Sequence, residues 1–135
     1  MRLGIVASRF NEAISGKLLA AAQAEAKKLG LEVEVASVPG ALEIPSALQW
    51  LAQTGKFDAL VAVGCVVRGE TYHFEVVSNE SARGLMDVAL DFGLPVANGI
   101  LTTEDEAQAL ARLDKGAEAV RAAVEMLKLK QKIQQ

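Results

Sequence analysis

The stretch Ala59–Val67, "ALVAVGCVV", constrains the fold more than any other part of the chain. Every residue in it is apolar or glycine, a pattern typical of a strand covered on both faces in a parallel sheet. We therefore expect this segment to be the central strand of such a sheet, with helices on each side.

The rest of the chain alternates between strand and helix patterns. Further strands are expected at Leu3–Val6, Leu31–Val38 and Pro95–Leu101. Helical spacing follows each strand, in segments at 8–30, 43–54, 69–91 and 104–113. Thr102 or Thr103 is expected to cap the last of these helices. A final helix is expected from Gly116 to near the C-terminus. This order predicts an α/β fold: a three-layer α/β/α sandwich whose four-stranded, parallel, flavodoxin-like sheet has helices on both faces.

Length and charge narrow the class of protein. A chain of 135 residues is expected to form one domain, 1–135. The chain has 14 Lys and Arg and 17 Asp and Glu, and its basic residues are not clustered in one block. This argues against a nucleic-acid partner. One cysteine and one histidine offer neither a disulfide nor a metal-ligand cluster, so we expect no metal and a cytoplasmic location. The chain also has no apolar stretch long enough to span a membrane.

The apolar content, 51%, is high for so small a monomer. One interpretation is that apolar surface is buried between subunits of a homo-oligomer. The other is a stable, alanine-rich monomer, and composition alone favours neither.

In parallel sheets of this kind, ligands bind beyond the carboxyl ends of the strands, where the strand order reverses. The segments that leave the predicted strands should therefore converge on one crevice. They are "SRFN" (8–11), "PGALEIP" (39–45), "VVRGETYH" (66–73) and "NGILTTE" (98–104).

The third segment carries the clearest chemistry. Gly69, Glu70 and Thr71 at the expected start of a helix could hold an anion, or Glu70 and Thr71 could simply cap that helix. His73 is the only histidine, and the positive end of the helix dipole would favour a neutral ring suited to proton transfer. A lone histidine is nevertheless more often structural or merely exposed.

The first two segments offer groups for a flat, hydroxylated ligand. Phe10 could stack on a heterocycle or belong to the core, and Asn11 most simply caps its helix. Gly40 and Ala41 allow close approach of the backbone to a ligand. Glu43 could accept hydrogen bonds from hydroxyls or stabilise the first turn of a helix.

Three further residues have plain interpretations. Cys65, inside the apolar strand, is expected to be an inert buried thiol. Arg68 is expected to be an ordinary surface charge. Arg112, near the end of an acidic-to-basic helix, most simply complements the helix dipole.

Together these segments resemble one family, 6,7-dimethyl-8-ribityllumazine synthase of riboflavin biosynthesis. The stretches that carry the resemblance are "SRFNEAIS", "VPGALEIP", "VGCVVRGETYHFE", "SNESARGLMDV", "PVANGILTTEDEAQALAR" and "KGAEAV". They cover nearly the whole chain in order, and the pairing of "PGALEIP" with "RGETYHFE" is the most specific part.

The resemblance implies a transferase without metal or redox cofactor. It would condense 5-amino-6-(D-ribitylamino)uracil with 3,4-dihydroxy-2-butanone 4-phosphate to give the lumazine, phosphate and water. By position, the resemblance implies that His73 transfers protons, that Glu70, Thr71 and Arg112 contact the phosphate, and that the ring and ribityl chain meet Phe10, Ala41, Leu42, Glu43, Cys65, Val66, Val67 and Asn98.

The resemblance also implies a homopentamer, or a multiple of pentamers, in which Asn98 and Arg112 come from the adjacent subunit, with riboflavin synthase as a candidate partner. Two features depart from the family pattern. The link "RLDKG" (112–116) is shorter than the corresponding link in the family. The direction in which Arg112 points and any role of Lys115 therefore stay open. The chain also starts at the first core strand, which makes a sixty-subunit shell less expected than a pentamer.

Other classes of function fit the sequence less well. A non-catalytic scaffold with the same fold would have no use for "RGETYH". A receiver domain would need an acidic cluster beside the first strand, and a flavin module would need a hydroxyl-rich phosphate loop, neither of which "IVASRFNE" provides. Pentameric riboflavin synthases match the segments at the strand ends less closely.

Overall fold

The computed structural model describes residues 1–135 and contains one parallel sheet of four strands. The strand order is β2-β1-β3-β4, so the direction of winding reverses between β1 and β3. The strands are β1 (Arg2–Ser8), β2 (Glu32–Val38), β3 (Ala59–Val67) and β4 (Val96–Thr103). The central strand expected from its apolar run has the predicted bounds.

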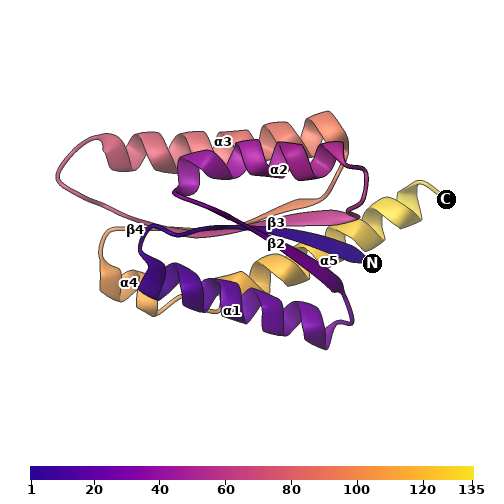
Figure 1. Cartoon of the computed structure of the whole chain (residues 1–135), viewed down its shortest axis with the longest axis horizontal. Helices are drawn as coiled ribbons and strands as arrows, with labels where there is room; N and C mark the ends of the chain where they lie inside the picture. The colour runs from indigo at the N-terminus through magenta and orange to yellow at the C-terminus, as the bar shows by residue number, and fades with distance from the viewer.

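Helices cover both faces of the sheet, which confirms the three-layer α/β/α architecture (Figure 1). The short 3-10 helix η1 and helices α2 and α3 lie on one face, and α1, α4 and α5 lie on the other. Their bounds are α1 (Glu12–Lys28), η1 (Ala41–Glu43), α2 (Ile44–Gln53), α3 (His73–Phe92), α4 (Glu106–Leu110) and α5 (Lys115–Ile133). None of these helices is both long and apolar enough to cross a bilayer.

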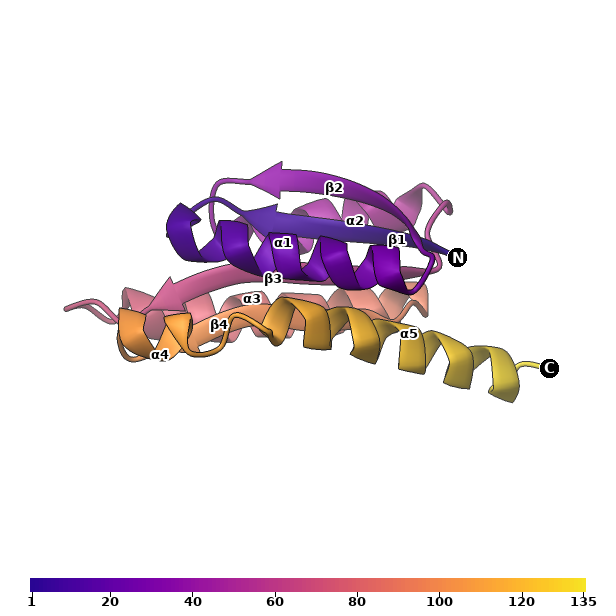
Figure 2. The ribbon, with the colours of Figure 1, turned by 90° about the horizontal axis from the view of Figure 1, so that it is seen from below.

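Alternation along β3 divides the core into two parts. Val61, Val63 and Cys65 belong to the cluster under α1 and α5, whereas Ala62 and Val66 belong to the cluster under α2 and α3. Figure 2 shows α1 and α5 lying next to each other on their face of the sheet. Burial on both sides agrees with the absence of charged and strongly polar residues from this strand.

Two helix ends use a backbone conformation that favours glycine. Gly93 follows α3 with φ of 63°, and Gly30 follows the end of α1 with φ of 74°. Glycine adopts positive φ without the steric penalty of a Cβ. Both glycines therefore act as the predicted stop signals.

Several predicted boundaries differ from the structure, and three of the differences lie near the strand exits. Helix α3 begins at His73, because Gly69–Tyr72 form an exposed loop in which the Thr71 hydroxyl accepts a hydrogen bond from His73 N at 3.4 Å. Strand β4 continues to Thr103, since Thr102 and Thr103 pair with the end of β3. Neither threonine caps α4: Asp105 does, with its carboxylate accepting from Gln108 N at 2.8 Å.

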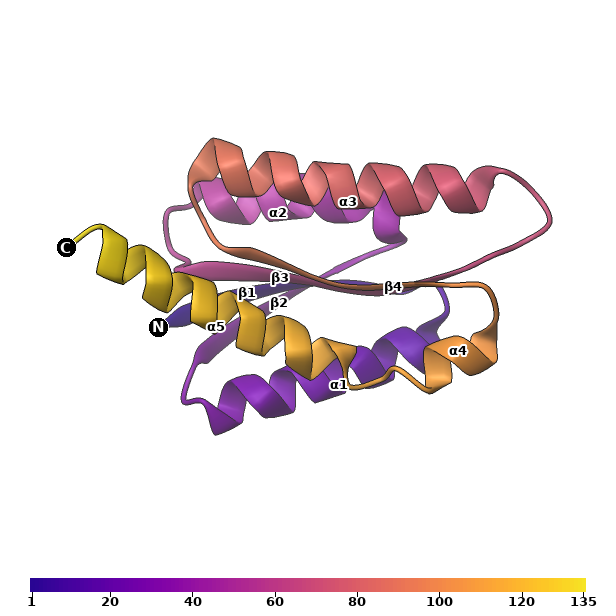
Figure 3. The same cartoon turned by 180° about the vertical axis from the view of Figure 1, so that it is seen from behind.

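The last elements return along the outer edge of the sheet. From behind, β4 leads into α4 and then α5, which runs back and extends past the sheet toward the C-terminus (Figure 3). The carboxyl ends of the strands and the N-terminal end of α3 thus lie at one end of the molecule, and the N-terminus lies at the other.

Candidate active site

A cavity of about 480 Å³ opens at the carboxyl ends of the strands, a size typical of small-molecule sites. It lies where the strand order reverses, between the exits of β1 and β3. Its lining comes from four places: the β1 exit, η1, the end of β3, and the loop and first turns of α3. The lining residues are Phe10, Gly40, Ala41, Leu42, Glu43, Cys65, Val66, Val67, Gly69, Thr71, His73, Phe74 and Val77.

Phe10 enters the cavity from the β1 exit. Its side chain is 71% exposed, so the interpretation of Phe10 as a core residue is wrong. The backbone around it is fixed by hydrogen bonds from Arg9 N to Val38 O at 2.9 Å and from Phe10 N to Pro39 O at 3.0 Å. An aromatic ring held on a fixed backbone at the mouth of a cavity can stack on a flat heterocycle.

Asn11 secures the same turn in a way that the sequence did not predict. Its φ of 58° and ψ of 48° are left-handed, and its side chain does not cap α1. The amide Nδ2 donates instead to the carbonyl oxygen of Cys65 at 2.9 Å. Asn11 therefore ties the exit of β1 to the end of β3.

The segment after β2 forms another wall. Glu43 N donates to Gly40 O at 3.1 Å and closes the 3-10 turn, in which Ala41 is buried while Leu42 and Glu43 are exposed. Glu43 is the one carboxylate in the lining. Backbone groups and a carboxylate on a rigid turn are suited to accept hydrogen bonds from a hydroxylated chain.

The end of β3 forms the floor. Val66 packs toward α2 and α3, whereas the Cys65 side chain is buried on the opposite face of the sheet. Burial raises the pKa of the Cys65 thiol, and the negative charge of Glu106 adds to this effect. A raised pKa lowers the fraction of thiolate, so the chemistry of a nucleophilic cysteine is disfavoured here.

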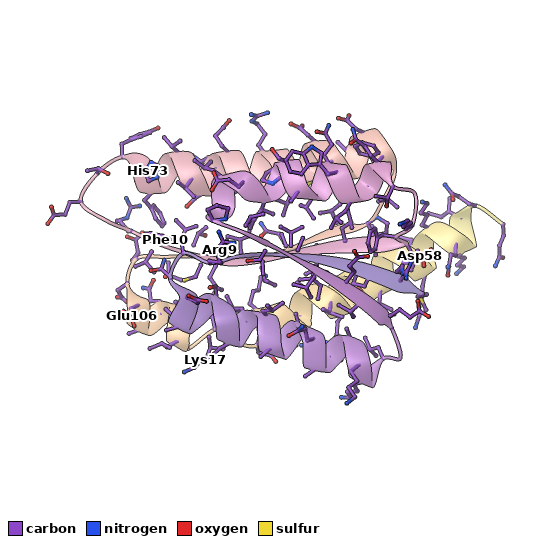
Figure 4. The ribbon with its side chains drawn as sticks, in the orientation of Figure 1. Arg9, Phe10, Lys17, Asp58, His73 and Glu106 are labelled. Atoms are coloured by element: carbon purple, nitrogen blue, oxygen red, sulfur yellow. The ribbon has the colours of Figure 1, made fainter.

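His73 and Thr71 lie at the N-terminal end of α3. Figure 4 shows His73 at the start of that helix and Phe10 between the helix and the sheet, at the same end of the molecule. Both His73 and Thr71 line the cavity and are exposed, which leaves the imidazole and the hydroxyl accessible to a ligand. Glu70 is exposed in the same loop but is not part of the lining.

Asn98 and Arg112 lie outside the cavity of their own chain. Asn98 sits in the first half of β4, so it does not leave a strand end as predicted, and its Oδ1 accepts from Ile100 N at 2.9 Å. Arg112 follows α4, on the opposite face of the sheet from α3, and its Nη1 donates to Gln108 O at 2.8 Å. Both residues are exposed.

The electrostatics of the cavity are incomplete in one chain. Its lining contains Glu43 and the imidazole of His73 but no lysine or arginine. A phosphate in this cavity would therefore meet a hydroxyl and backbone N–H groups, but no fixed positive charge. No group of three or more His, Cys, Asp or Glu side chains is arranged to hold a metal ion.

Sequence reasoning missed Phe74 and Val77 as lining residues. They lie three residues apart on the inner face of α3, and Val77 is buried there. Helical periodicity counted from Phe74 could have found them, because residues three and four apart share a face. That spacing alone would not have distinguished a cavity wall from the core.

The chain is similar to known proteins over almost its whole length. A family model described as 6,7-dimethyl-8-ribityllumazine synthase matches residues 1–131. The 6,7-dimethyl-8-ribityllumazine synthase of Azoarcus sp. (strain BH72) is 57% identical over 133 residues, which cover 96% of this chain and 85% of that protein. Those of Cupriavidus pinatubonensis (strain JMP 134 / LMG 1197) and Cupriavidus metallidurans (strain ATCC 43123 / DSM 2839 / NBRC 102507 / CH34) are each 59% identical over 133 residues, covering 96% of this chain and 80% and 79% of theirs.

These relatives all carry the name of an enzyme, so the alternative of a non-catalytic scaffold is not favoured. The flavodoxin-like sheet agrees with the resemblance found in the sequence. The chain belongs to the 6,7-dimethyl-8-ribityllumazine synthase family, transferases of riboflavin biosynthesis.

Proposed function

We propose that the cavity at the strand ends is where this chain condenses 5-amino-6-(D-ribitylamino)uracil with 3,4-dihydroxy-2-butanone 4-phosphate. The observation that carries the proposal is the convergence of Phe10, the η1 turn, the end of β3 and His73 on one cavity. These groups match the needs of a flat ring, a polyhydroxyl chain and a proton transfer, and they lie on the segments that resemble the family.

The pyrimidine and its ribityl chain would occupy the part of the cavity between β1 and β3. The ring of Phe10 stacks on the uracil, and the backbone of Cys65, Val66 and Val67 faces its edge. Ala41, Leu42 and Glu43 hold the ribityl chain, with the Glu43 carboxylate accepting hydrogen bonds from its hydroxyls. This arrangement orients the 5-amino group toward the start of α3.

The phosphate of the second substrate would sit near the loop Gly69–Tyr72. Thr71 can donate its hydroxyl, and Glu70 contributes through the backbone of the loop. Because the lining has no cation, we assign the positive charge to Arg112 of a second copy, whose guanidinium can donate paired hydrogen bonds to phosphate. Asn98 of the second copy is assigned to the ring on the resemblance to the family, and its exposure outside the cavity of its own chain is compatible with this.

A site that needs two copies implies an assembly, and on the resemblance to the family we propose a pentamer or a multiple of pentamers. Large apolar side chains remain exposed in the single chain, among them Trp50, Met86 and Leu90. Exposed apolar surface of this kind is suited to contacts between subunits.

Catalysis in this site needs orientation and proton transfer rather than a strong nucleophile. The 5-amino group attacks the ketone, water leaves to give an imine, phosphate is eliminated, and the ribityl-bearing nitrogen closes the ring with loss of a second water. His73 is placed to move protons in these steps. Holding the two substrates in register supplies much of the remaining acceleration.

The direct test is to incubate the purified protein with both substrates and to record the absorbance of the lumazine. Relative to wild type, His73→Ala should lower kcat by roughly 100-fold, the low end of what a single general acid-base side chain contributes, because orientation of the two substrates supplies much of the remaining acceleration. A wild-type rate in the His73→Ala variant would remove His73 from the mechanism, and no lumazine from the wild-type protein would refute the activity.

The two-copy site has a separate test. Phe10→Glu disables the cavity and Arg112→Ala disables the contribution from the neighbour, so each homo-oligomer should be nearly inactive. After the two variants are dissociated and reassembled together in equal amounts, about a quarter of the sites should contain both native residues and activity should return. A mixture no more active than its components would show that both residues act within one chain.

Arg112→Lys tests the phosphate contact itself. The variant keeps the charge but loses the paired donors, so the KM for the phosphate substrate should rise by about 10-fold while the KM for the pyrimidine stays constant. Arg2→Lys is the matched control, because Arg2 lies at the amino end of β1, far from the strand exits. An unchanged KM in Arg112→Lys would exclude this role.

A further inference from the structure

Arg68 makes more contacts than the ordinary surface charge expected from the sequence. It directly follows β3, and its backbone N–H donates to Thr103 O at 2.9 Å. Its guanidinium forms an ion pair with Glu75 through Nη1 and another with Glu104 through Nε. The same guanidinium lies over the ring of Phe74, 4.4 Å from its centroid. One side chain thus joins the β3 exit, the first turn of α3 and the segment after β4.

The segment 69–72, which follows Arg68, makes few stabilising contacts of its own. Residues 69–72 are all exposed, and α3 begins without a side-chain cap. The one side-chain hydrogen bond within the segment, from His73 N to Thr71 Oγ1, is long at 3.4 Å. The first turn of α3 is therefore held by the packing of the helix that follows it and by contacts from outside the segment, and not by the segment itself.

Arg68 supplies those contacts at two consecutive residues of the turn. It stacks on Phe74, which lines the cavity, and it pairs with Glu75. The buried residues from Val77 onward fix the rotation of the body of α3, and Arg68 adds two neighbouring anchors in the first turn, where successive side chains are about 100° apart. The side chain of His73, the residue before Phe74, is thereby aimed as well.

The charge of Arg68 is already matched. Two carboxylates hold its guanidinium, and together the three groups carry a formal charge of −1. A phosphate brought to Arg68 would face Glu75 and Glu104, which repel it. Arg68 is therefore placed to orient neighbouring groups and is poorly placed to bind the phosphate of the substrate.

We propose that Arg68 is a positioning residue, which aims His73 and the Phe74 wall into the cavity through its contacts with Phe74, Glu75 and Glu104. This proposal rests on the proposed function only for its effect on the reaction rate. The aim of His73 itself is a property of the protein without substrate, so it can be measured independently of catalysis.

The first measurement compares wild type with Arg68→Gln under steady-state conditions. We expect kcat to fall by roughly 10-fold to 100-fold, because misplacing a reacting group by about 1 Å costs that much, while KM for the phosphate substrate changes by less than about 3-fold. Arg68→Lys keeps the charge without the planar guanidinium, so its kcat should lie between those of wild type and Arg68→Gln. An Arg68→Gln variant with unchanged kcat and a KM raised about 10-fold would identify Arg68 as a phosphate ligand and overturn the proposal.

The second measurement needs no substrate. The chain has one histidine, so the imidazole C–H signals in an NMR spectrum of histidine-labelled protein belong to His73 alone. Arg68→Gln should shift or broaden these signals. The control Arg83→Gln should not, because Arg83 pairs only with Glu80 and Asp87 on the outside of α3. An unperturbed His73 signal in Arg68→Gln would refute the positioning role even if the enzyme were inactive for another reason.

Glu104→Gln provides a second variant in case Arg68→Gln does not fold. It removes one anchor and leaves Arg68 stacked on Phe74 and paired with Glu75. The fall in kcat and the change in the His73 signal should have the same direction as in Arg68→Gln and a smaller size. Wild-type values of both would contradict the proposal.

Discussion

The side-chain amide of Asn11 donates a hydrogen bond of 2.9 Å to the carbonyl oxygen of Cys65. This bond crosses the point where the strand order reverses, since Asn11 follows β1 and Cys65 lies near the end of β3. Phe10 and Cys65, the residues on either side of the cavity at this point, are thus held at a fixed separation. The floor of the cavity and its aromatic wall are parts of one hydrogen-bonded unit.

Two substitutions of Asn11 should distinguish the contribution of its hydrogen bond to stability from that of its left-handed backbone. Asn11→Gly suits the φ of 58° and loses only the hydrogen bond, so the free energy of unfolding should fall by about 1 kcal/mol. Asn11→Asp turns a carboxylate oxygen toward the Cys65 carbonyl and should cost about 2–3 kcal/mol. Urea unfolding of both variants checks the order, and an aspartate variant as stable as wild type would show that the bond contributes nothing.

Most elements could be predicted because their causes are local. The apolar run of Ala59–Val67 defines β3, and Gly30 and Gly93 stop helices through their own backbone preference. The cavity residues followed from one topological rule, that ligands bind at strand exits. The single-domain interpretation, by contrast, stays a prediction.

What could not be predicted depends on distant partners. Asn11 is 54 residues from Cys65, and Arg68 is 36 residues from Glu104, so neither pairing leaves a local pattern. Asn11 was therefore interpreted as a helix cap and Arg68 as a surface charge. Asn98 was misplaced because it was counted with the segment that leaves the strand, whereas β4 runs from Val96 to Thr103 and ends on the two threonines that pair with β3.

Gly116 should be essential to the contact between α1 and α5. A Cβ at this position would lie 2.1 Å from the carbonyl oxygen of Leu18, a backbone atom that cannot rotate away. Gly116→Ala should therefore lower the free energy of unfolding by about 2–3 kcal/mol. The matched control is Gly16→Ala, in α1 itself. A Cβ at position 16 would have no atom within 4 Å apart from the nearby backbone of its own helix, so the free energy of unfolding should rise by about 0.5–1 kcal/mol. Equal effects of the two substitutions in chemical denaturation would contradict this account.

Ser8, at the end of β1, and Gly64, in β3, should behave as a coupled pair. Ser8 Oγ is buried without a hydrogen-bond partner, and it lies 2.4 Å from where a Cβ at position 64 would be. Ser8→Ala should be neutral or slightly stabilising, whereas Gly64→Ala should cost about 1–3 kcal/mol.

The double variant is the informative one. With alanine at position 8, the nearest remaining atoms to the new Cβ are 3.5 Å away, an ordinary contact, so much of the loss should be recovered. A double-mutant cycle measured by thermal or urea unfolding gives the coupling free energy. Strictly additive effects would mean that the hydroxyl and the new methyl group do not compete for the same space.

The ion pair between Arg68 and Glu75 should appear in the acid stability of the protein. The hydrogen bond and charge of Arg68 hold the pKa of Glu75 below its ordinary value of 4.5. A carboxylate with a lowered pKa binds fewer protons in the folded state than in the unfolded state. Its contribution to stability is therefore complete above about pH 4.5 and is lost as the pH falls through the lower pKa of the folded state.

Glu75→Gln removes this titration, so the difference in unfolding free energy between wild type and variant should be largest near pH 7 and should shrink toward pH 3. Glu34→Gln serves as the control, because Glu34 is exposed on β2 away from Arg68, and its difference from wild type should be small across the range. Urea unfolding at a series of pH values measures both differences. If the difference in unfolding free energy between wild type and Glu75→Gln stayed constant from pH 7 to pH 3, the ion pair with Arg68 would not lower the proton affinity of Glu75. The role of that contact in orienting the first turn of α3 would then lose its electrostatic basis.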